Sequence, residues 1–242
     1  MLLGLLGKSL SHSFSKPFFE AYFASNQLNA TYSNFEIETI EHVSTVFAVE
    51  GLTGFNVTIP YKEAILPFLD ELSPEAKEIG AVNTVKIVNG KKIGYNTDAF
   101  GFQQSIKPFL TNLHEKALVL GTGGASKAVA YVLKNIGIDV LYVTRNPSNS
   151  NEFSYEQINE YMLKACKLVV NTTPVGTFPN IEESPAFPFE FLSNEHLVVD
   201  LIYNPAETLF LKSAKEAGAT ILNGESMLKE QALKSWQIWN SN

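Results

Sequence analysis

The chain has 242 residues, of which 45% are hydrophobic and 18% are charged, and its formal net charge is −7. These proportions are typical of a globular protein with one large domain or two small ones and ample length for a core. The acidic balance argues against a general nucleic-acid binder, which would need a basic surface. No apolar run approaches the roughly 20 residues that a membrane-spanning helix requires. We therefore expect neither nucleic acid nor a membrane among the partners.

The N-terminus and the single cysteine bear on the compartment. The opening residues, MLLGLLG, are apolar, but they lack a basic region and become polar at Lys8, so we interpret them as a buried strand and not a signal peptide. Cys166 has no partner for an internal disulfide and lies just before the apolar run LVV. It is expected to be a core residue and not a nucleophile. These features predict a cytoplasmic protein.

The first half of the chain alternates strand-like and helix-like segments. Short alternating or apolar runs predict strands, and apolar residues three to four apart predict helices. We expect strands at residues 2–6, 31–37 and 52–58, and helices at 17–27, 40–49 and 61–69. Asn89-Gly90 separates two alternating runs, VNTVKIV and KKIGYN, which is typical of a β-hairpin. Antiparallel strands added to a βα pattern predict an α/β domain with a mixed sheet.

The second half has a more regular rhythm. We expect strands at residues 117–121, 138–143, 168–171, 197–201 and 219–222, and helices at 98–110, 124–136, 206–217 and 225–239. Strands that alternate with helices predict a Rossmann-like parallel sheet. Residues 179–193 are rich in proline, acidic residues and phenylalanine, which predicts a long surface loop with a short helix. The last helix carries an apolar stripe expected to face the core, formed by Leu228, Ala232, Trp236 and Trp239.

The segment Gly-Phe-Asn-Val-Thr-Ile-Pro-Tyr-Lys at residues 54–62 points to chemistry. Pro60 suits the first position of a helix, so Lys62 is expected in the first helical turn. A cation there opposes the helix dipole at a cost of roughly 0.3–1 kcal/mol. A lysine held against this preference, beside the polar side chains of Asn56 and Thr58, is a candidate catalytic group. A solvated lysine on a helix face is the alternative.

A glycine-rich turn predicts a dinucleotide site. Gly121-Thr122-Gly123-Gly124-Ala125-Ser126 follows the apolar strand ALVL and begins a helix rich in alanine and valine. Glycines allow a tight turn and a close approach of the backbone to a pyrophosphate, which the N-terminus of the helix favours electrostatically. The motif alone is a weak signal, and its position between strand and helix strengthens it.

The end of the next expected strand discriminates between cofactors. In proteins that bind a cofactor with a free ribose 2′-hydroxyl, an acidic residue about 20 residues after the glycines usually accepts a hydrogen bond from that hydroxyl. Asp and Glu are absent from residues 140–151, and the only arginine of the chain, Arg145, stands there between Thr144 and Asn146. A guanidinium binds phosphate through two hydrogen bonds, so the 2′-phosphate of NADP is the predicted partner. A solvated arginine is the alternative.

Three further polar segments are ambiguous from sequence. Asn171-Thr172-Thr173-Pro174 follows a strand of the second half and either lines the cofactor or forms a simple turn. Asp98, in Asn96-Thr97-Asp98, stands where Asp commonly caps a helix. His12-Ser13-Phe14-Ser15 supplies two hydroxyls in the loop after the first strand, where a capping or turn role is the default.

Taken in order, these segments resemble the shikimate dehydrogenase family. The matches are HSxS at 12–15, NVTIPYK at 56–62, AVNT at 81–84, NTD at 96–98, GTGGAS at 121–126, NTTPVG at 171–176, DLIYNPAET at 200–208 and NGESMLKEQA at 223–232. They span nearly the whole chain. NVTIPYK combined with NTD and the C-terminal MLxxQ is highly specific, whereas the glycine turn alone is not.

The resemblance implies an NADP-dependent enzyme that reversibly reduces 3-dehydroshikimate to shikimate, in the biosynthesis of chorismate and aromatic amino acids. It implies Lys62 and Asp98 as the catalytic pair and no metal. The substrate-binding residues that it implies are Ser13, Ser15, Thr58, Asn83, Asn96, Asp98, Tyr203 and Gln231. The cofactor-binding residues that it implies are Gly121, Gly123, Gly124, Ala125, Ser126, Thr144, Arg145, Asn146, Thr172, Gly224 and Met227.

The chemistry agrees with these roles, although the sequence departs from the family pattern in places. Hydride transfer to a ketone builds negative charge on oxygen, which a positioned ammonium neutralises and protonates. Lys16 intervenes before Pro17 where family members commonly have proline directly after the second serine, so the role of Ser15 is less secure than that of Ser13. No second basic residue follows Arg145, so NADP preference is expected to be weaker, with Ser126 or Lys127 as helpers. Glu225 replaces the usual apolar residue after the glycine of the C-terminal motif, with no effect that we can assign.

We expect two domains. Residues 1–98, completed by the terminal helix 225–242, are the predicted substrate domain, and residues 99–224 are the predicted dinucleotide domain. The alternatives are a quinate/shikimate dehydrogenase that prefers NAD and a non-catalytic ligand sensor or assembly subunit on the same scaffold. The resemblance is compatible with a monomer or a homodimer.

Overall fold

The computed structural model describes residues 1–11 and 13–241 and divides into two compact units. The first unit comprises Met1–Thr97 and Ala232–Asn242, and the second comprises Asp98–Gln231. Helix α9 (Glu225–Asn240) therefore contributes its first residues to the second unit and the remainder to the first. Among the described helices, none is long and apolar enough to cross a membrane.

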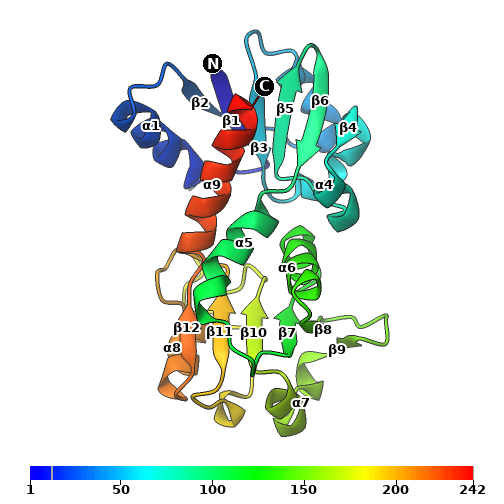
Figure 1. Cartoon of the computed structure of the whole chain (residues 1–242), viewed down its shortest axis with the longest axis vertical. Coiled ribbons are helices and arrows are strands. Elements are labelled where there is room, and N and C mark those ends of the chain that lie inside the picture. The colour runs from blue at the N-terminus through cyan, green and yellow to red at the C-terminus, as the bar shows by residue number, and fades with distance from the viewer. Residues whose placement is uncertain (12, 242) are drawn as a thin grey trace. The chain divides into compact units, whose positions relative to one another are not determined.

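The first unit is built on a mixed sheet (Figure 1). Its strands are β1 (Leu2–Gly7), β2 (Thr31–Glu36), β3 (Gly54–Val57), β4 (Glu71–Leu72), β5 (Thr84–Val88) and β6 (Lys91–Tyr95). They lie in the order β2-β1-β3-β5-β6-β4, with β1 parallel to β2 and β3, and β5 antiparallel to β3 and β6. Asn89 and Gly90 form the hairpin turn with positive φ of 50° and 79°, so the mixed sheet predicted from the Asn-Gly signal is confirmed.

The helical segments of the first unit are short. They are α1 (Ser15–Ser25), η1 (Ile40–His42), α2 (Val43–Phe47), α3 (Tyr61–Ala64), η2 (Leu66–Phe68) and α4 (Pro74–Ile79). The predicted helix at 61–69 is wrong in length, because Pro67 lies in the first turn of η2 and cannot continue the hydrogen bonding of α3. Pro60 precedes α3 and does not begin it. A single turn of four residues has no appreciable macrodipole, so the electrostatic misfit expected of Lys62 does not exist.

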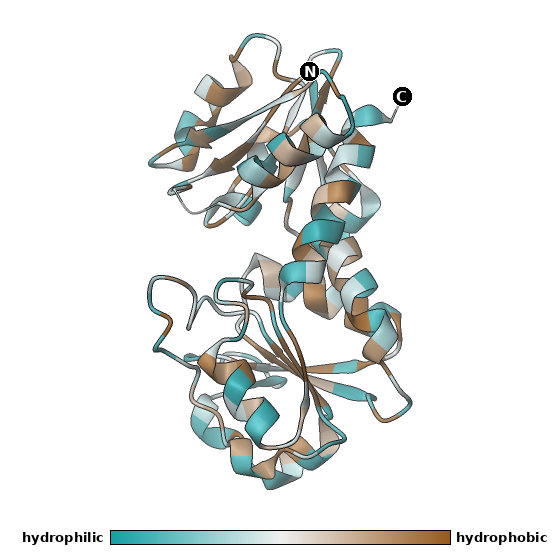
Figure 2. Ribbon diagram, turned by 90° about the vertical axis from the view of Figure 1, so that its left-hand side faces the viewer, coloured by the Kyte–Doolittle hydropathy of each residue, from teal (hydrophilic) through white to brown (hydrophobic). Residues whose placement is uncertain are grey.

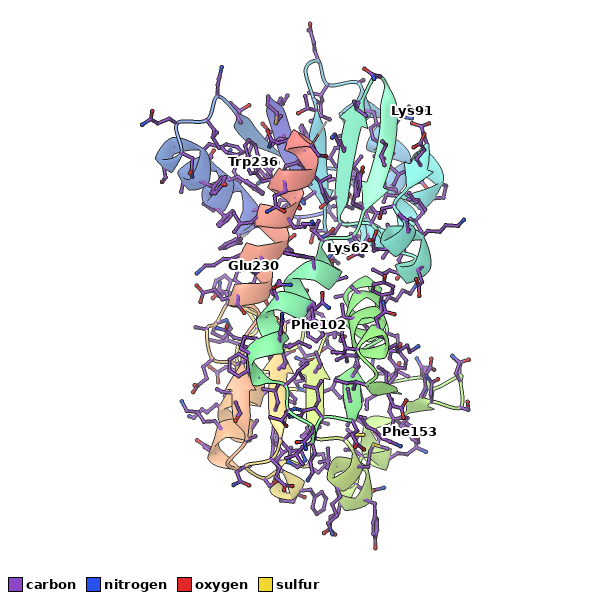
Figure 3. The ribbon with its side chains drawn as sticks, in the orientation of Figure 1. Lys62, Lys91, Phe102, Phe153, Glu230 and Trp236 are labelled. Carbon is purple, nitrogen blue, oxygen red and sulfur yellow. The ribbon has the colours of Figure 1, made fainter. Side chains whose placement is uncertain are left out.

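An aromatic cluster fastens α9 to the first sheet. Phe19 and Phe23 of α1 stack near Tyr32 and the two tryptophans of α9. Trp236 packs on Phe23 at a centroid distance of 5.1 Å (Figure 3). The Trp239 indole N–H donates to the Val85 carbonyl at 2.9 Å, over Gly54, where a Cβ would lie 2.4 Å from that nitrogen. Of the predicted stripe, Ala232 and Trp239 are buried and Trp236 is half-buried.

The second unit is a doubly wound sheet with every pairing parallel. Its strands are β7 (Lys116–Leu120), β8 (Asp139–Val143), β9 (Glu152–Phe153), β10 (Leu168–Asn171), β11 (Leu197–Asp200) and β12 (Thr220–Leu222). Its helical segments are α5 (Asp98–Ile106), η3 (Lys107–Phe109), α6 (Gly124–Asn135), η4 (Tyr155–Gln157), α7 (Glu160–Ala165), η5 (Phe189–Phe191) and α8 (Leu209–Glu216). The order β12-β11-β10-β7-β8-β9 confirms the Rossmann-like prediction.

Burial explains the composition of the second sheet. The residues of β10 and β11 are all buried, and Figure 2 shows the strands of this sheet as predominantly apolar. Such continuous apolar runs are what strands covered on both faces require. Two predicted helices are shorter than expected: α5 stops at Ile106 ahead of Pro108, and α8 begins at Leu209, where the Thr208 hydroxyl accepts the Leu211 N–H at 3.2 Å.

Candidate active site

In the first unit, the sheet brings the predicted substrate-site segments to one edge. β1 and β3 are parallel, so the segments that follow them, residues 8–15 and 58–62, leave from the same side. β5 is antiparallel, so Asn83 precedes it at that same edge, and β6 returns there to deliver Asn96. Thr84 pairs with both Asn56 and Tyr95, which fixes this register. Four chain segments thus converge although up to 80 residues separate them in sequence.

Lys62 lies in α3, directly after the strand-end residue Thr58. The Thr58 carbonyl accepts the Tyr61 N–H at 2.9 Å, and the Lys62 carbonyl accepts the Val82 N–H at 2.7 Å. The backbone of this turn is thus held to the segment that leads into Asn83. The Lys62 side chain is half-buried, and Ile59 beside it is 69% exposed (Figure 3 labels Lys62).

A buried polar network lies behind this edge, and the sequence analysis missed it. Asn56 is 4% exposed; its side-chain oxygen accepts the Tyr32 hydroxyl at 2.8 Å, and its nitrogen lies 3.0 Å from Thr84 Oγ1 and 2.9 Å from Ser235 Oγ. Burial raises the pKa of Tyr32 well above 10.0, opposed by a hydrogen bond with the Ser15 side chain. Asn56, one of the polar neighbours of Lys62 in the sequence, is thus a structural core residue. A polar residue inside an apolar strand was the available signal.

Asn83 and Asn96 are both buried, at 2% and 8% exposure. Asn83 makes a reciprocal pair with Thr97: its amide nitrogen donates to Thr97 Oγ1 at 2.9 Å, and its oxygen accepts the Thr97 N–H at 2.7 Å. Asn96 donates to the Ala81 carbonyl at 2.9 Å. These bonds orient both carboxamides, so each can present its remaining hydrogen-bonding capacity only in a fixed direction.

The serine loop after β1 is also ordered by its own hydrogen bonds. The Ser13 hydroxyl accepts the Ser15 N–H at 3.2 Å, and the Ser13 N–H donates to the Leu10 carbonyl at 3.0 Å. Ser15 begins α1 and is 9% exposed, whereas Ser13 is half-buried. His12, the first residue of the HSxS match, lies outside the described residues.

In the second unit, the glycine turn has the geometry that a dinucleotide requires. Gly121 adopts φ = +104°, and a Cβ there would lie 2.7 Å from Thr172 Oγ1. Gly123 ends the turn in an extended conformation, with no atom within 4 Å of its Cβ position. The first N–H groups of α6, at Gly124 and Ala125, have no acceptor within the helix. An open, amide-lined turn fits a pyrophosphate.

Two hydroxyls that were predicted to bind the cofactor also build the turn. Ser126 is 1% exposed and donates to the Gly121 carbonyl at 2.7 Å. Thr172 follows β10 and donates to the Leu120 carbonyl at 2.6 Å. Both bonds close the turn onto its own backbone, so these residues shape the site from behind.

Arg145 stands beside the glycine turn, because β8 is the parallel neighbour of β7. The Gly121 N–H donates to the Val143 carbonyl at 2.8 Å, and Thr144, Arg145 and Asn146 follow at once. Arg145 is exposed, and within the described part of the chain it forms no ion pair. The first acid that follows it in sequence, Glu152, accepts hydrogen bonds from Asn149 Nδ2 at 2.7 Å and from the Ser148 N–H at 2.7 Å, and these bonds lower its pKa. The guanidinium is therefore available for a phosphate.

A second buried network closes the carboxyl ends of β10 and β11. Asp200 is fully buried and accepts hydrogen bonds from Thr208 Oγ1 at 2.7 Å, Asn171 Nδ2 at 3.1 Å and the Ile202 N–H at 3.1 Å. Burial raises the pKa of Asp200 to about 6, against the lowering effect of these donors. The Asn171 oxygen accepts from Thr173, so the NTTP segment is a turn braced by Asp200.

The remaining predicted residues lie on α5, on the loop after β11 and at the start of α9. Asp98 is the first residue of α5 and is 5% exposed. One helical turn later, a Cβ on Gly101 would lie 2.5 Å from the Met227 carbonyl, so the α5 and α9 backbones touch beside Gln231. Of the others, Tyr203 is half-buried, and Met227 and Gly224 are buried.

No group of three or more His, Cys, Asp or Glu side chains that could hold a metal ion occurs among residues 1–11 and 13–241. One domain is a parallel doubly wound sheet with a glycine turn and an arginine. The other domain carries a lysine and two oriented carboxamides at one edge of its sheet. Together these features define a dinucleotide-dependent oxidoreductase.

Comparison with known proteins identifies the family. The family model described as the shikimate dehydrogenase substrate binding domain matches residues 5–85. Proteins named shikimate dehydrogenase (NADP(+)) from Methanococcus vannielii and Aquifex aeolicus are 37% and 41% identical, each over 99% of this chain and 91% of their own length. The shikimate 5-dehydrogenase of Thermus thermophilus, solved with NADP(H) and shikimate, superposes with a TM-score of 0.87 at 34% identity, covering 99% of this chain and 93% of that one. The chain belongs to the shikimate dehydrogenase family.

Proposed function

We propose that the protein is an NADP-dependent shikimate dehydrogenase, which reversibly reduces the ketone of 3-dehydroshikimate to the alcohol of shikimate in chorismate and aromatic amino-acid biosynthesis. The observation that carries the proposal is the identity of 37–41%, over 99% of the chain, to proteins that bear this name. The residues agree with it, since one unit has a dinucleotide turn and the other has a lysine beside oriented polar groups.

NADPH supplies the hydride when it is bound, and the residues of the second unit fit it. Gly121, Gly123, Gly124 and Ala125 offer a tight turn, in which Gly121 has no room for a side chain, together with the first N–H groups of α6. The proposed 2′-phosphate ligand is the exposed guanidinium of Arg145, whose flanking residues Thr144 and Asn146 complete the pocket for the ribose. Ser126 and Thr172 support this pocket by shaping the turn, and Gly224 and Met227 border it in the proposed assignment.

Lys62 and Asp98 are the proposed catalytic pair. The Lys62 ammonium donates a proton to the substrate oxygen as negative charge develops there, and a nearby carboxylate keeps the ammonium charged and oriented. Asp98 is the proposed carboxylate, and it also accepts from the substrate hydroxyl. In the oxidation direction Lys62 is regenerated by taking the proton back.

The remaining proposed substrate ligands are hydroxyl and amide groups. They are Ser13, Ser15, Thr58, Asn83, Asn96, Tyr203 and Gln231. A polyhydroxylated ring suits such a set, because a buried polar group left without a partner rejects analogues that lack the matching hydroxyl. The oriented carboxamides of Asn83 and Asn96 make this selection strict, since neither can rotate without losing the bonds to Thr97 and Ala81.

The test is turnover of shikimate with oxidised NADP, followed by the absorbance of NADPH, in wild type and Lys62→Ala. Removing the proton-transfer group is expected to lower kcat by about 10²–10⁴-fold with little change in KM for shikimate. Lys77→Ala, which removes an exposed lysine from α4, is the matched control and should keep wild-type rates. Wild-type activity in Lys62→Ala would refute the assignment.

The two alternatives differ in cofactor and in catalysis. A quinate/shikimate dehydrogenase that prefers NAD would turn over quinate and show a higher kcat/KM with NAD than with NADP. Arg145 favours NADP, because its guanidinium can bind the 2′-phosphate through two hydrogen bonds. Arg145→Ala is therefore expected to lower the ratio of kcat/KM with NADP to kcat/KM with NAD at least tenfold. An unchanged ratio would contradict this role. A ligand sensor would bind shikimate without any turnover.

Location and assembly stay predictions of the sequence. A cytoplasmic location is expected from the lone cysteine, and a monomer or a homodimer from the family resemblance. Size-exclusion chromatography with light scattering distinguishes the two assemblies.

A further inference from the structure

Three buried hydroxyl groups meet in the first unit, behind the sheet edge that carries Asn83. They belong to Thr84 in β5, Thr97 after β6 and Ser235 in α9, and each residue is at most 1% exposed. Ser235 Oγ lies 2.8 Å from Thr84 Oγ1 and 3.1 Å from Thr97 Oγ1, and the two threonine oxygens are 3.3 Å apart. We call these three residues the hydroxyl cluster. Ser235 is its centre, because it makes the two shorter contacts.

The cluster joins segments that are remote in sequence, since Thr84 and Ser235 are 151 residues apart. From β3, Asn56 Nδ2 lies 3.0 Å from Thr84 Oγ1 and 2.9 Å from Ser235 Oγ. One turn after Ser235, the Trp239 indole N–H donates to the carbonyl of Val85, the residue that follows Thr84. Helix α9 is therefore fastened to β5 at two successive turns, and Ser235 has a fixed place on the sheet.

The Ser235 hydroxyl is not needed to bury α9. The helix packs on the first sheet through apolar side chains, with Ala232 and Trp239 buried and Trp236 packed against them. Serine forms helices less readily than alanine, and a buried hydroxyl costs free energy unless it is hydrogen-bonded. A second alanine in place of Ser235 would pack without either cost. What the hydroxyl adds is its hydrogen bonds to the neighbouring polar groups, and such a satisfied buried network fixes the groups that it joins.

The cluster reaches Asn83 through Thr97. The Thr97 N–H can only donate, and it lies 2.7 Å from Asn83 Oδ1, which fixes the oxygen end of the carboxamide. At the other end, Asn83 Nδ2 donates to Thr97 Oγ1 at 2.9 Å. The main chain of Thr97 thus orients the oxygen of the carboxamide, and its hydroxyl orients the nitrogen. Because Thr97 Oγ1 is itself held by Ser235 and Thr84, the direction of the Asn83 side chain depends on all three hydroxyls.

We propose that the hydroxyl cluster is a positioning element for the substrate, which acts through Asn83. Thr97 holds the carboxamide directly, and Ser235 keeps the Thr97 hydroxyl in place. This role rests on the proposed function, in which Asn83 binds the substrate. The three hydroxyls need not touch the substrate, so part of substrate recognition is assigned to a residue of the C-terminal helix.

Two variants of Thr97 separate its hydroxyl from its packing. Thr97→Val keeps the branched shape and the N–H but removes the hydroxyl, whereas Thr97→Ser keeps the hydroxyl and removes the methyl group. We expect Thr97→Val to lower kcat/KM for shikimate, at saturating NADP, by at least about threefold, because one of the bonds that orient Asn83 is lost. Thr97→Ser, which keeps that bond, should stay within about twofold of wild type. A role in packing alone predicts the reverse, with Thr97→Ser as the impaired variant.

Ser235→Ala tests the cluster from the side of the helix, and alanine favours the folding of α9. It should lower kcat/KM for shikimate, as Thr97→Val does. Ser105→Ala is the matched control, because Ser105 is a buried helix serine of the second unit whose hydroxyl donates to the Phe102 carbonyl at 2.8 Å. This control should keep the wild-type kcat/KM. In all these variants, titration calorimetry should give the wild-type Kd for NADPH, because none of them alters the dinucleotide turn.

A double-mutant cycle shows whether the cluster acts through Asn83. In the Asn83→Ala background, Thr97→Val should reduce kcat/KM by less than about twofold, because the group that Thr97 orients is already absent. Reductions that multiply in the double variant would overturn the proposal, as would a wild-type kcat/KM in Thr97→Val or in Ser235→Ala. If wild type itself does not turn over shikimate, the proposed function fails and this role with it. That result is distinct from an active wild type with unaffected variants, which refutes the positioning role alone.

Discussion

Asp200 should make the stability of the second unit depend on pH in a direction opposite to that of an ordinary salt-bridged carboxylate. Its side chain is fully buried, and burial raises its pKa from 3.8 to about 6. Below about pH 4, the Asp200 carboxyl is largely protonated in both the folded and the unfolded chain, so its burial does not lower the free energy of unfolding. As pH rises, the unfolded chain ionises first, while the folded state keeps its proton until about pH 6, so the free energy of unfolding falls across this window.

The size of the effect follows from the two pKa values. A difference of about 2.2 pH units at about 1.36 kcal/mol each amounts to a loss of about 3 kcal/mol, complete above pH 6. About 2 kcal/mol of this loss falls between pH 4.5 and 7.5. Asp200→Asn keeps an oxygen for the donors Asn171 and Ile202 and turns an N–H₂ toward Thr208, whose hydroxyl can accept. The variant cannot ionise, so it should lack the pH-dependent loss.

The assay is urea unfolding followed by far-UV circular dichroism, for wild type and Asp200→Asn, at intervals from pH 4.5 to 7.5. The stability of the variant relative to wild type should improve by about 2 kcal/mol over that range. Asp139→Asn, which changes an aspartate whose side chain is 76% exposed in the same unit, is the control and should track wild type. The argument would be refuted if the difference in free energy of unfolding between wild type and Asp200→Asn stayed constant with pH. A ¹³C titration that places the Asp200 pKa at or below 4 would also refute it.

Two further predictions concern the glycine turn and the cysteine. Gly121→Ala forces an L side chain into φ = +104° and against Thr172 Oγ1, so it should destabilise the protein by at least about 1–2 kcal/mol in urea unfolding. In Gly123→Ala the added Cβ has no atom within 4 Å, so the variant should unfold like wild type. Its affinity for NADPH, measured by titration calorimetry, should fall at least tenfold. An unchanged affinity would contradict the placement of the pyrophosphate. Burial raises the pKa of Cys166 to about 11, so its thiol should react with Ellman's reagent only as the protein unfolds, and rapid reaction in the native state would show the burial to be wrong.

Local patterns were sufficient for most elements because each is specified by residues close in sequence. The Asn89-Gly90 hairpin needs two residues that tolerate positive φ, and the strand before Gly121 is a short apolar run, so both were predicted within a residue or two. Two of the errors in helix length came from single prolines. Pro67 and Pro108 end helices that the hydrophobic spacing alone would continue.

The buried networks could not be predicted, because their partners meet only through sheet register. Asn56 and Ser235 are 179 residues apart, and they bond because α9 packs on the first sheet through Trp239. Asp200 and Asn171 meet because β10 and β11 pair in parallel with these residues opposite each other. In the sequence each of these residues is a single polar residue within or just after an apolar run, and nothing indicates its hydrogen-bond partner.

The sequence by itself determined the class of fold and predicted a dinucleotide turn and a phosphate ligand at Arg145, because strand–glycine–helix order and charge are local properties. Only the tertiary structure decided which polar residues face a ligand and which support the chain. Ser126 and Asn171 looked like ligand contacts, yet their hydrogen bonds close a turn or brace a neighbouring strand end. The physical reason is that a hydrogen bond is satisfied by proximity in space, and proximity is set by the packing of segments remote in the chain.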